Sequence, residues 1–110
     1  MNKITHEPKN CDSVQTTLKV LGGKWKPVIL YLLSGSTLRF GQLKRNITGI
    51  SQKMLTQELR ELESDGLISR KVYPQVPPKV EYSPTAYGKT LEPILKSMSA
   101  WGKAHKARVK

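Results

Sequence analysis

The segment of residues 50–83 constrains the fold more than any other part of the chain. Residues 51–65 are predicted to form a helix, because Ser51 is a favourable N-cap and leucines follow it at helical spacing. Gly66 then ends the helix, since glycine readily adopts the left-handed conformation found at helix C-termini. The residues after Gly66 are therefore expected to form a different kind of element.

Two stretches with strand character follow the glycine, Leu67–Tyr73 and Val80–Ser83. Between them Pro74, Pro77 and Pro78 remove backbone donors and fix the shape of the loop. This order is that of the second half of a winged helix-turn-helix: a helix, a glycine that ends it, a basic strand, a stiff loop and a return strand. We therefore predict an α+β fold that is mostly α, with a two-stranded β-hairpin wing.

The other predicted elements complete this architecture. The first helix is capped by Asp12 or Ser13 and ends at Gly22-Gly23. A second, largely apolar helix over 25–33 is expected at the centre of the core. A short strand at 38–40, a brief third helix containing Phe40, Leu43 and Ile47, and a last helix over 85–104 complete the set.

One domain is expected from residue 11 to 106, with a flexible arm over 1–10 and a basic tail over 107–110. The longest apolar run, residues 28–33, is much shorter than the roughly 20 residues that span a bilayer. The N-terminus has no apolar stretch that could act as a signal peptide. A single cysteine suits a reducing compartment, so we expect a cytoplasmic protein without membrane contact.

The charge of the chain indicates a polyanionic partner. There are 19 lysines and arginines against 8 aspartates and glutamates, a net charge of +11. No acidic residue lies between Asp12 and Glu58. A merely basic, solvated surface is the alternative, but a domain-wide excess of this kind is expected of a protein that binds phosphates.

The helix over 51–65 has a polar face that suits a DNA groove. Lys53, Thr56, Gln57 and Arg60 lie opposite the leucines, and such side chains can pair with base edges. The alternative is an ordinary amphipathic helix with a solvated polar face. The basic helix before it and the hairpin after it favour DNA, and the acidic residues Glu58, Glu61, Glu63 and Asp65 are expected in solvent on its flank or C-terminal end. The candidate recognition residues are Ser51, Gln52, Lys53, Thr56, Gln57 and Arg60.

A second set of cations is expected on the DNA backbone, where charge is needed and sequence information is not. An edge hairpin protected from aggregation by lysine and proline is the alternative explanation for its wing members. The position of the hairpin directly after the recognition helix favours a wing. The set comprises Arg39, Lys44, Arg45, Arg70, Lys71 and Lys79.

The last helix carries an apolar stripe longer than a small domain readily buries alone. We predict that this stripe and the first helix form a two-fold interface. Burial within one chain is the alternative. The stripe also includes Tyr87, and the candidate interface residues are Val14, Leu18, Leu21, Leu91, Ile94, Leu95, Met98 and Trp101.

Over residues 11–101 the chain resembles the HxlR-type transcription regulators, which are close to the MarR group of winged-helix proteins. The resemblance implies a homodimer that binds a palindromic operator in double-stranded DNA and represses or activates transcription. The chain departs from the family pattern at Ser83-Pro84, where the second strand is expected to end early, and at Asp12, where proline is common. The matching residues are Cys11, Gly22-Gly23-Lys24-Trp25, Arg39-Phe40, Gly49-Ile50-Ser51, Leu55-Thr56, Leu59-Arg60-Glu61-Leu62, Asp65-Gly66-Leu67-Ile68, Pro77-Pro78-Lys79-Val80-Glu81-Tyr82, Thr85, Gly88 and Trp101.

Cys11 is the candidate for signal chemistry, because some HxlR-type proteins sense quinones, aldehydes or oxidants through a cysteine at this place. A helix N-terminus and Lys9 would lower its pKa, whereas Asp12 would oppose that. An inert thiol is equally compatible with one cysteine, so a redox or small-molecule inducer stays open.

No metal site, cofactor motif or catalytic arrangement is predicted. The alternatives to a DNA-binding regulator are a winged-helix protein-interaction module and, with less support, a thiol enzyme.

Overall fold

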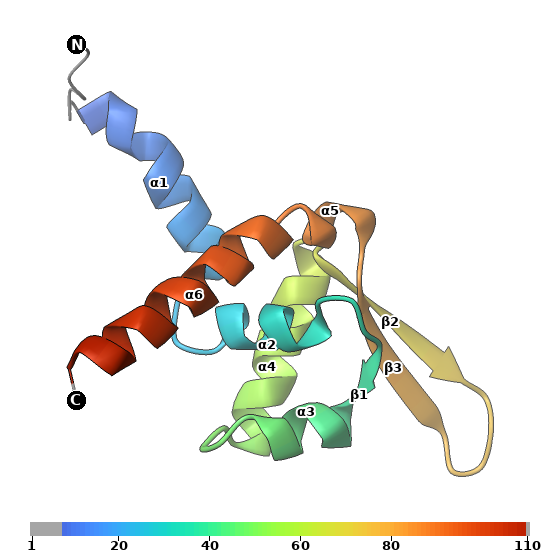
Figure 1. The fold of residues 1–110 in the computed structure, drawn as a ribbon. Helices are drawn as coiled ribbons and strands as arrows, with labels where there is room; N and C mark the ends of the chain where they lie inside the picture. The colour runs from blue at the N-terminus through green and yellow to red at the C-terminus, as the bar shows by residue number, and fades with distance from the viewer. Residues whose placement is uncertain (1–7, 110) are drawn as a thin grey trace.

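The computed structural model describes residues 8–109 of the 110-residue chain, and the order of its elements is that of the predicted winged helix-turn-helix (Figure 1). The apolar helix α2 lies at the centre, between α4 and α6, and the hairpin of β2 and β3 projects from the body. The elements are α1 (Pro8–Leu21), α2 (Lys26–Leu33), β1 (Leu38–Arg39), α3 (Phe40–Asn46), α4 (Gln52–Ser64), β2 (Ile68–Tyr73), β3 (Lys79–Pro84), α5 (Ala86–Lys89) and α6 (Glu92–Arg108).

The buried core consists of leucine and isoleucine side chains from every helix except α5, from β2 and from the segments between elements. Ile29 and Leu33 of α2 are fully buried, as predicted for the central helix. Burying apolar side chains in this way is the main favourable term in folding. The complete core is Leu21, Ile29, Leu30, Leu33, Leu43, Ile47, Ile50, Leu55, Leu59, Leu62, Leu67, Ile68 and Leu95.

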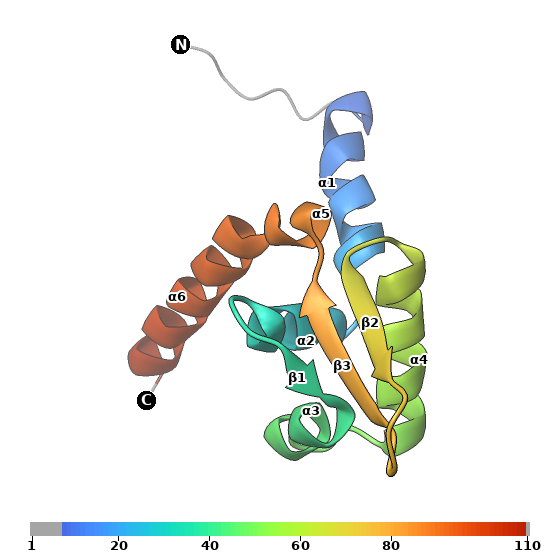
Figure 2. The same cartoon turned by 90° about the vertical axis from the view of Figure 1, so that its right-hand side faces the viewer.

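The sheet of the described residues is antiparallel with the order β1-β3-β2 (Figure 2), so β1 is a short third strand that pairs with the middle of β3. Glu81 of β3 lies between Arg39 of β1 and Lys71 of β2. The expectation that Ser83-Pro84 ends the second strand early is wrong, because β3 continues to Pro84 opposite Ile68. Proline is tolerated there because β1 pairs no further along β3 than Tyr82, and Pro84 is the last residue of its strand.

Helix α4 has the predicted limits. The Ser51 hydroxyl accepts a hydrogen bond from the backbone N–H of Met54 at 3.0 Å, which is an N-cap. Gly66 has a φ of 76°, the left-handed conformation that terminates a helix. The orientation of the polar face of α4 is therefore set by local sequence at both ends.

The predicted start of the first helix is wrong, because α1 begins at Pro8 rather than after Asp12 or Ser13. Proline suits the first turn of a helix, since its missing N–H would have no partner there. The carbonyl of Asp12 accepts a bond from the Thr16 hydroxyl at 2.9 Å, as a residue inside a helix can. Residues 8–10, predicted as part of the arm, are thus helical.

The predicted single helix over 85–104 is also wrong, because it is divided into α5 and α6. Pro93 lies in the first turn of α6, where it lacks the N–H that a continuous helix would need. Thr85 caps α5 by accepting from the N–H of Gly88 at 2.9 Å. Helix α6 extends to Arg108, so the first residues of the predicted tail are helical. None of the helices within residues 8–109 has the length and hydropathy needed to cross a membrane.

Candidate nucleic-acid interface

The polar face of α4 is open to solvent. Gln52, Lys53, Gln57 and Arg60 are exposed, and together with the half-buried Thr56 they line one shallow depression along the helix. The Thr56 hydroxyl donates to the carbonyl oxygen of Gln52 at 2.9 Å. The structure therefore brings together the side chains that the helical spacing predicted on this face.

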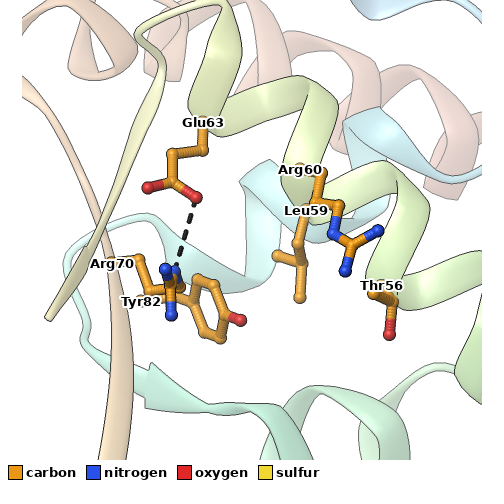
Figure 3. Close-up of a pocket in the computed structure, with 6 residues that line it drawn as sticks. All are labelled: Thr56, Leu59, Arg60, Glu63, Arg70 and Tyr82. Carbon is orange, nitrogen blue, oxygen red and sulfur yellow. Dashed lines mark ion pairs between the residues drawn. The ribbon is translucent and has the colours of Figure 1, made fainter. Parts of the chain in front are cut away.

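A pocket lies between α4 and the wing (Figure 3), so residues of both predicted contact surfaces line it. Arg60 faces it from α4, while Arg70 and Tyr82 face it from the two wing strands. The Nε of Arg70 lies 3.6 Å from a carboxylate oxygen of Glu63, so this wing cation is held towards α4. Burial raises the pKa of the Tyr82 hydroxyl above 10.0, so the group is neutral at pH 7.

On the other face of the wing, Tyr73 organises the two remaining wing cations. The ammonium groups of Lys71 and Lys79 lie 5.0 and 4.5 Å from the centre of its ring. The Tyr73 hydroxyl donates to Glu81 at 2.9 Å, and this bond is the main reason that the pKa of Glu81 is lowered. Tyr73 was not among the predicted site residues, although an aromatic residue between two lysines of a hairpin was a usable signal.

The cations before α4 lie on and beside α3. Arg39 occupies its N-cap, where the backbone N–H of Arg39 donates to the side chain of Gln42 at 2.9 Å. Lys44 and Arg45 are exposed in the last turn of α3. All three side chains are available to a ligand approaching the α3 and α4 side of the molecule.

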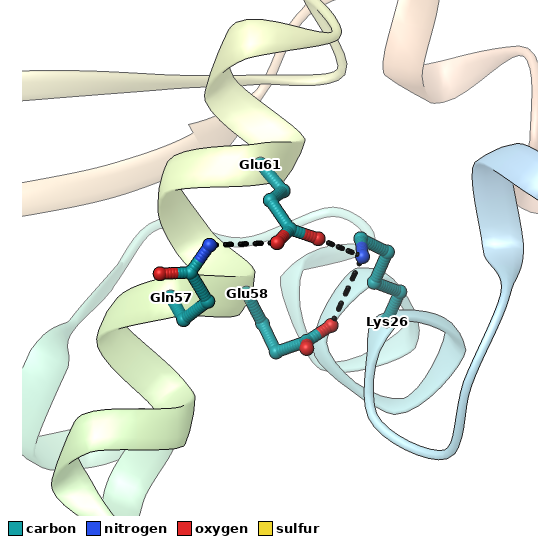
Figure 4. A network of polar contacts seen from close by, with 4 residues as sticks. All are labelled: Lys26, Gln57, Glu58 and Glu61. Carbon is teal, nitrogen blue, oxygen red and sulfur yellow. Dashed lines mark hydrogen bonds and ion pairs between the residues drawn. The ribbon is translucent and has the colours of Figure 1, made fainter.

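A partly buried cation that the sequence analysis missed connects α2 to α4 (Figure 4). Lys26 has a side chain only 11% exposed, and its Nζ lies 3.2 Å from Glu58 and also bonds to Glu61. The prediction that Glu58 lies in solvent is wrong, because its side chain is 14% exposed and pairs with Lys26. Glu61 is 44% exposed, as predicted, but it also bonds to Lys26. Glu61 also accepts a bond from Gln57, and these two contacts lower its pKa, with Gln57 the larger cause.

The predicted interface residues fall into two groups. Leu21 and Leu95 are 7% and 3% exposed, so these two side chains belong to the core of the chain itself and leave little surface for a partner. Leu91 is half-buried against the same core. The others are exposed apolar side chains on α1 and α6: Val14, Leu18, Ile94, Met98 and Trp101.

Cys11 lies in the first turns of α1, and its side chain falls outside the described part of the structure. Within the residues described, no three histidine, cysteine, aspartate or glutamate side chains gather as metal ligands would.

Comparisons with known proteins agree with this geometry. The family described as HxlR-like helix-turn-helix matches residues 20–110. The HTH-type transcriptional regulator YtcD of Bacillus subtilis is 58% identical over 97 residues, which are 88% of this chain and 77% of YtcD. The structure of the redox regulator HypR in its reduced form is similar with a TM-score of 0.83 at 48% identity, over 88% of this chain and 96% of that one. The oxidised form of HypR gives a TM-score of 0.81 at 51% identity, over 84% and 95% of the two chains.

Proposed function

Because this chain belongs to the HxlR-like helix-turn-helix family of DNA-binding transcriptional regulators, we propose that it binds an inverted-repeat operator as a homodimer and inserts α4 into the major groove. The exposed polar face of α4, lying beside the cationic wing, carries this proposal. Arginine and lysine can pair with guanine, glutamine with adenine, and a threonine methyl group with thymine. Ser51 and Gln52, at the N-terminal end of α4, would enter the groove first.

The backbone contacts come from both sides of α4 in this proposal. Lys44 and Arg45 on α3 and Lys71 on the wing are exposed, so each can approach a phosphate. Arg70 and Lys79 are partly engaged by Glu63 and Glu81, and their charge is offset in the free protein. We therefore expect Lys44, Arg45 and Lys71 to contribute more to the salt dependence than Arg70 and Lys79.

The proposed dimer uses the apolar surface that the fold leaves uncovered. Leu18 on α1 and Trp101 on α6 are 60% and 68% exposed, which is unusual for such large apolar side chains. A two-fold interface would cover them and place the two recognition helices one or two turns of DNA apart. The operator should then be an inverted repeat.

The proposal includes a response to oxidants through Cys11, supported by the likeness to HypR, a redox regulator. The first turn of a helix stabilises a thiolate through its backbone N–H groups. Oxidation that joins two subunits or adds a small thiol would change the relative placement of the recognition helices. The proposal assigns no reaction to the chain and places it in the cytoplasm, where the chromosome is.

Selection of bound duplexes from a random pool tests the central claim. We expect an enriched inverted repeat, and Arg60→Ala should relax the preference at one base pair in each half-site. If the parent enriches no sequence, a winged-helix module that binds another protein becomes the better explanation. If Arg60→Ala and Gln57→Ala both keep every preference of the parent, α4 is not the recognition element.

A further inference from the structure

The side chain of Gln57 is held at the edge of the recognition face by a chain of polar contacts that begins in α2 (Figure 4). Lys26 bonds to one carboxylate oxygen of Glu61, and the other oxygen accepts from the Nε2 of Gln57 at 2.7 Å. Gln57 and Glu61 are one helical turn apart, the spacing at which side chains on one face of a helix meet. Glu61 thus links Lys26 of α2 to Gln57 of α4.

This chain of contacts fixes which end of the Gln57 amide faces outward. An ionised carboxylate can only accept hydrogen bonds, so the amide nitrogen of Gln57 must face Glu61. The bonds from Gln57 and Lys26 lower the pKa of Glu61, which keeps it ionised at neutral pH. Figure 4 shows the carbonyl oxygen of Gln57 pointing away from Glu61, and Gln57 is exposed to solvent.

Lys26 holds Glu61 in place while it is itself held by Glu58. The Lys26 side chain is 11% exposed and that of Glu58 is 14% exposed, so this pair is shielded from solvent. Glu61 is 44% exposed and would move more freely without the lysine. Lys26 and Glu61 therefore restrict a side chain on the DNA-facing surface without lying on that surface.

We propose that Lys26 and Glu61 are specificity-determining positioning residues, which make Gln57 present a hydrogen-bond acceptor to DNA. The base that it selects would carry an exocyclic amino group in the major groove, which adenine and cytosine have and guanine and thymine lack. A free glutamine side chain can turn over and offer its NH₂ group to guanine instead. The inference rests on the proposed function, since it concerns the base contact of one residue of α4.

The first experiment compares base preferences in the selected operator. Gln57→Ala identifies the base pair that Gln57 contacts, and the parent should favour adenine or cytosine there by about fivefold or more. Glu61→Gln should reduce this preference to less than twofold or allow guanine to bind there. The new amide at position 61 can donate as well as accept, so it no longer fixes which end of Gln57 faces outward. Preferences at all other positions should stay as in the parent.

Asp65→Asn is the matched control. It removes one carboxylate from the same helix, but Asp65 is exposed at the C-cap and its cap bonds are made by its backbone N–H. It should change the overall affinity, as loss of a negative charge near DNA does, and leave every base preference intact. Glu61→Gln with an unchanged preference at the Gln57 base pair overturns the inference, as does a parental preference for guanine or thymine at that position.

The second experiment makes its decisive comparison with the parent protein, so that comparison does not depend on how a variant folds. The selected base is replaced by its analogue without the amino group, purine for adenine or 2-pyrimidinone for cytosine. The parent should bind the analogue about fivefold more weakly, and Gln57→Ala should bind both duplexes equally. Equal binding by the parent overturns the inference while leaving sequence-specific binding in place, whereas a parent without any enriched sequence overturns both.

Discussion

Gly88 of α5 lies against the backbone carbonyl oxygen of Leu67, and a Cβ at Gly88 would come within 2.0 Å of that oxygen. The backbone N–H of Thr85 donates to the same oxygen at 3.1 Å, and the Thr85 hydroxyl donates to Gly66. The start of the wing and the start of the C-terminal helices are therefore packed together without room for another atom.

Gly88→Ala should lower the free energy of unfolding by about 2 kcal/mol or more, because the new methyl group forces two backbone segments apart. Urea unfolding measures the change. Gly41→Ala on exposed α3 is the control, since its Cβ would only meet the flexible end of Arg45 at 3.4 Å. Gly41→Ala should be neutral or stabilising by up to about 1 kcal/mol, and equal effects of the two substitutions would contradict the tight packing of Gly88.

Acid should destabilise the protein through Glu61. Its pKa is lowered below 4.5 in the folded state, so it contributes stability above pH 4.5 that is lost as the pH falls through the lower folded value. The pKa of Lys26 is raised above 10.5, mainly by Glu61, so its contribution is lost only as the pH rises above 10.5. Between pH 6 and pH 3.5, the free energy of unfolding measured with urea should fall less for Glu61→Gln than for the parent. An equal fall in both proteins would mean that the contacts of Glu61 do not stabilise the fold.

Removal of the Lys26 cation should destabilise the fold at neutral pH. Lys26→Met keeps the length of the side chain but leaves the shielded Glu58 without its partner, at a cost of about 1–3 kcal/mol. Thermal unfolding measures the cost, and the double variant Lys26→Met with Glu58→Gln should recover part of it. A single variant as stable as the parent would show that the pair contributes nothing to stability.

The wing should contribute charge but no sequence preference. Lys71→Ala should reduce the slope of log K against log salt concentration by roughly 0.9, the value for one phosphate contact. Tyr73→Ala should weaken binding to all sequences alike, because both lysines lose the ring beneath them. Lys103→Ala on α6 should leave the slope unchanged; a slope for Lys71→Ala equal to that of the parent would remove the wing from the interface.

The apolar surface of α1 and α6 should govern the oligomeric state. Leu18→Glu should raise the dissociation constant of the dimer by at least about tenfold, because it replaces an apolar contact with a desolvated charge. Sedimentation equilibrium measures the change. Val76→Glu, at a loop position that is 98% exposed, is the control and should leave the dimer intact.

The proposed oxidant response should depend on Cys11 alone, since the chain has one cysteine. Cys11→Ser should bind the operator as the parent does under reducing conditions and should no longer respond to diamide. Fluorescence anisotropy with a labelled operator measures both states. Parent protein whose affinity is the same before and after thiol modification would end the redox proposal.

The sequence by itself determined the elements whose limits depend on neighbouring residues. Ser51 and Gly66 set the ends of α4, and the helical period of Leu55, Leu59 and Leu62 set its buried face and hence its exposed one. These features follow from backbone geometry over one or two turns, so they are visible in a single chain. The prediction of the winged helix-turn-helix and the proposal of its recognition face rested on them.

Only the tertiary structure decided which residues meet across the chain. Lys26 and Glu61 are 35 residues apart, and no local spacing predicts that a lysine at the start of an apolar helix will hold a glutamate beside the proposed recognition face. The contact of Gly88 with Leu67 and the burial of Leu21 and Leu95 likewise depend on how helices and strands pack. An amphipathic pattern predicts that one face of a helix is apolar, but the same pattern is typical of a core and of an interface. Only the packing of the elements distinguishes the two.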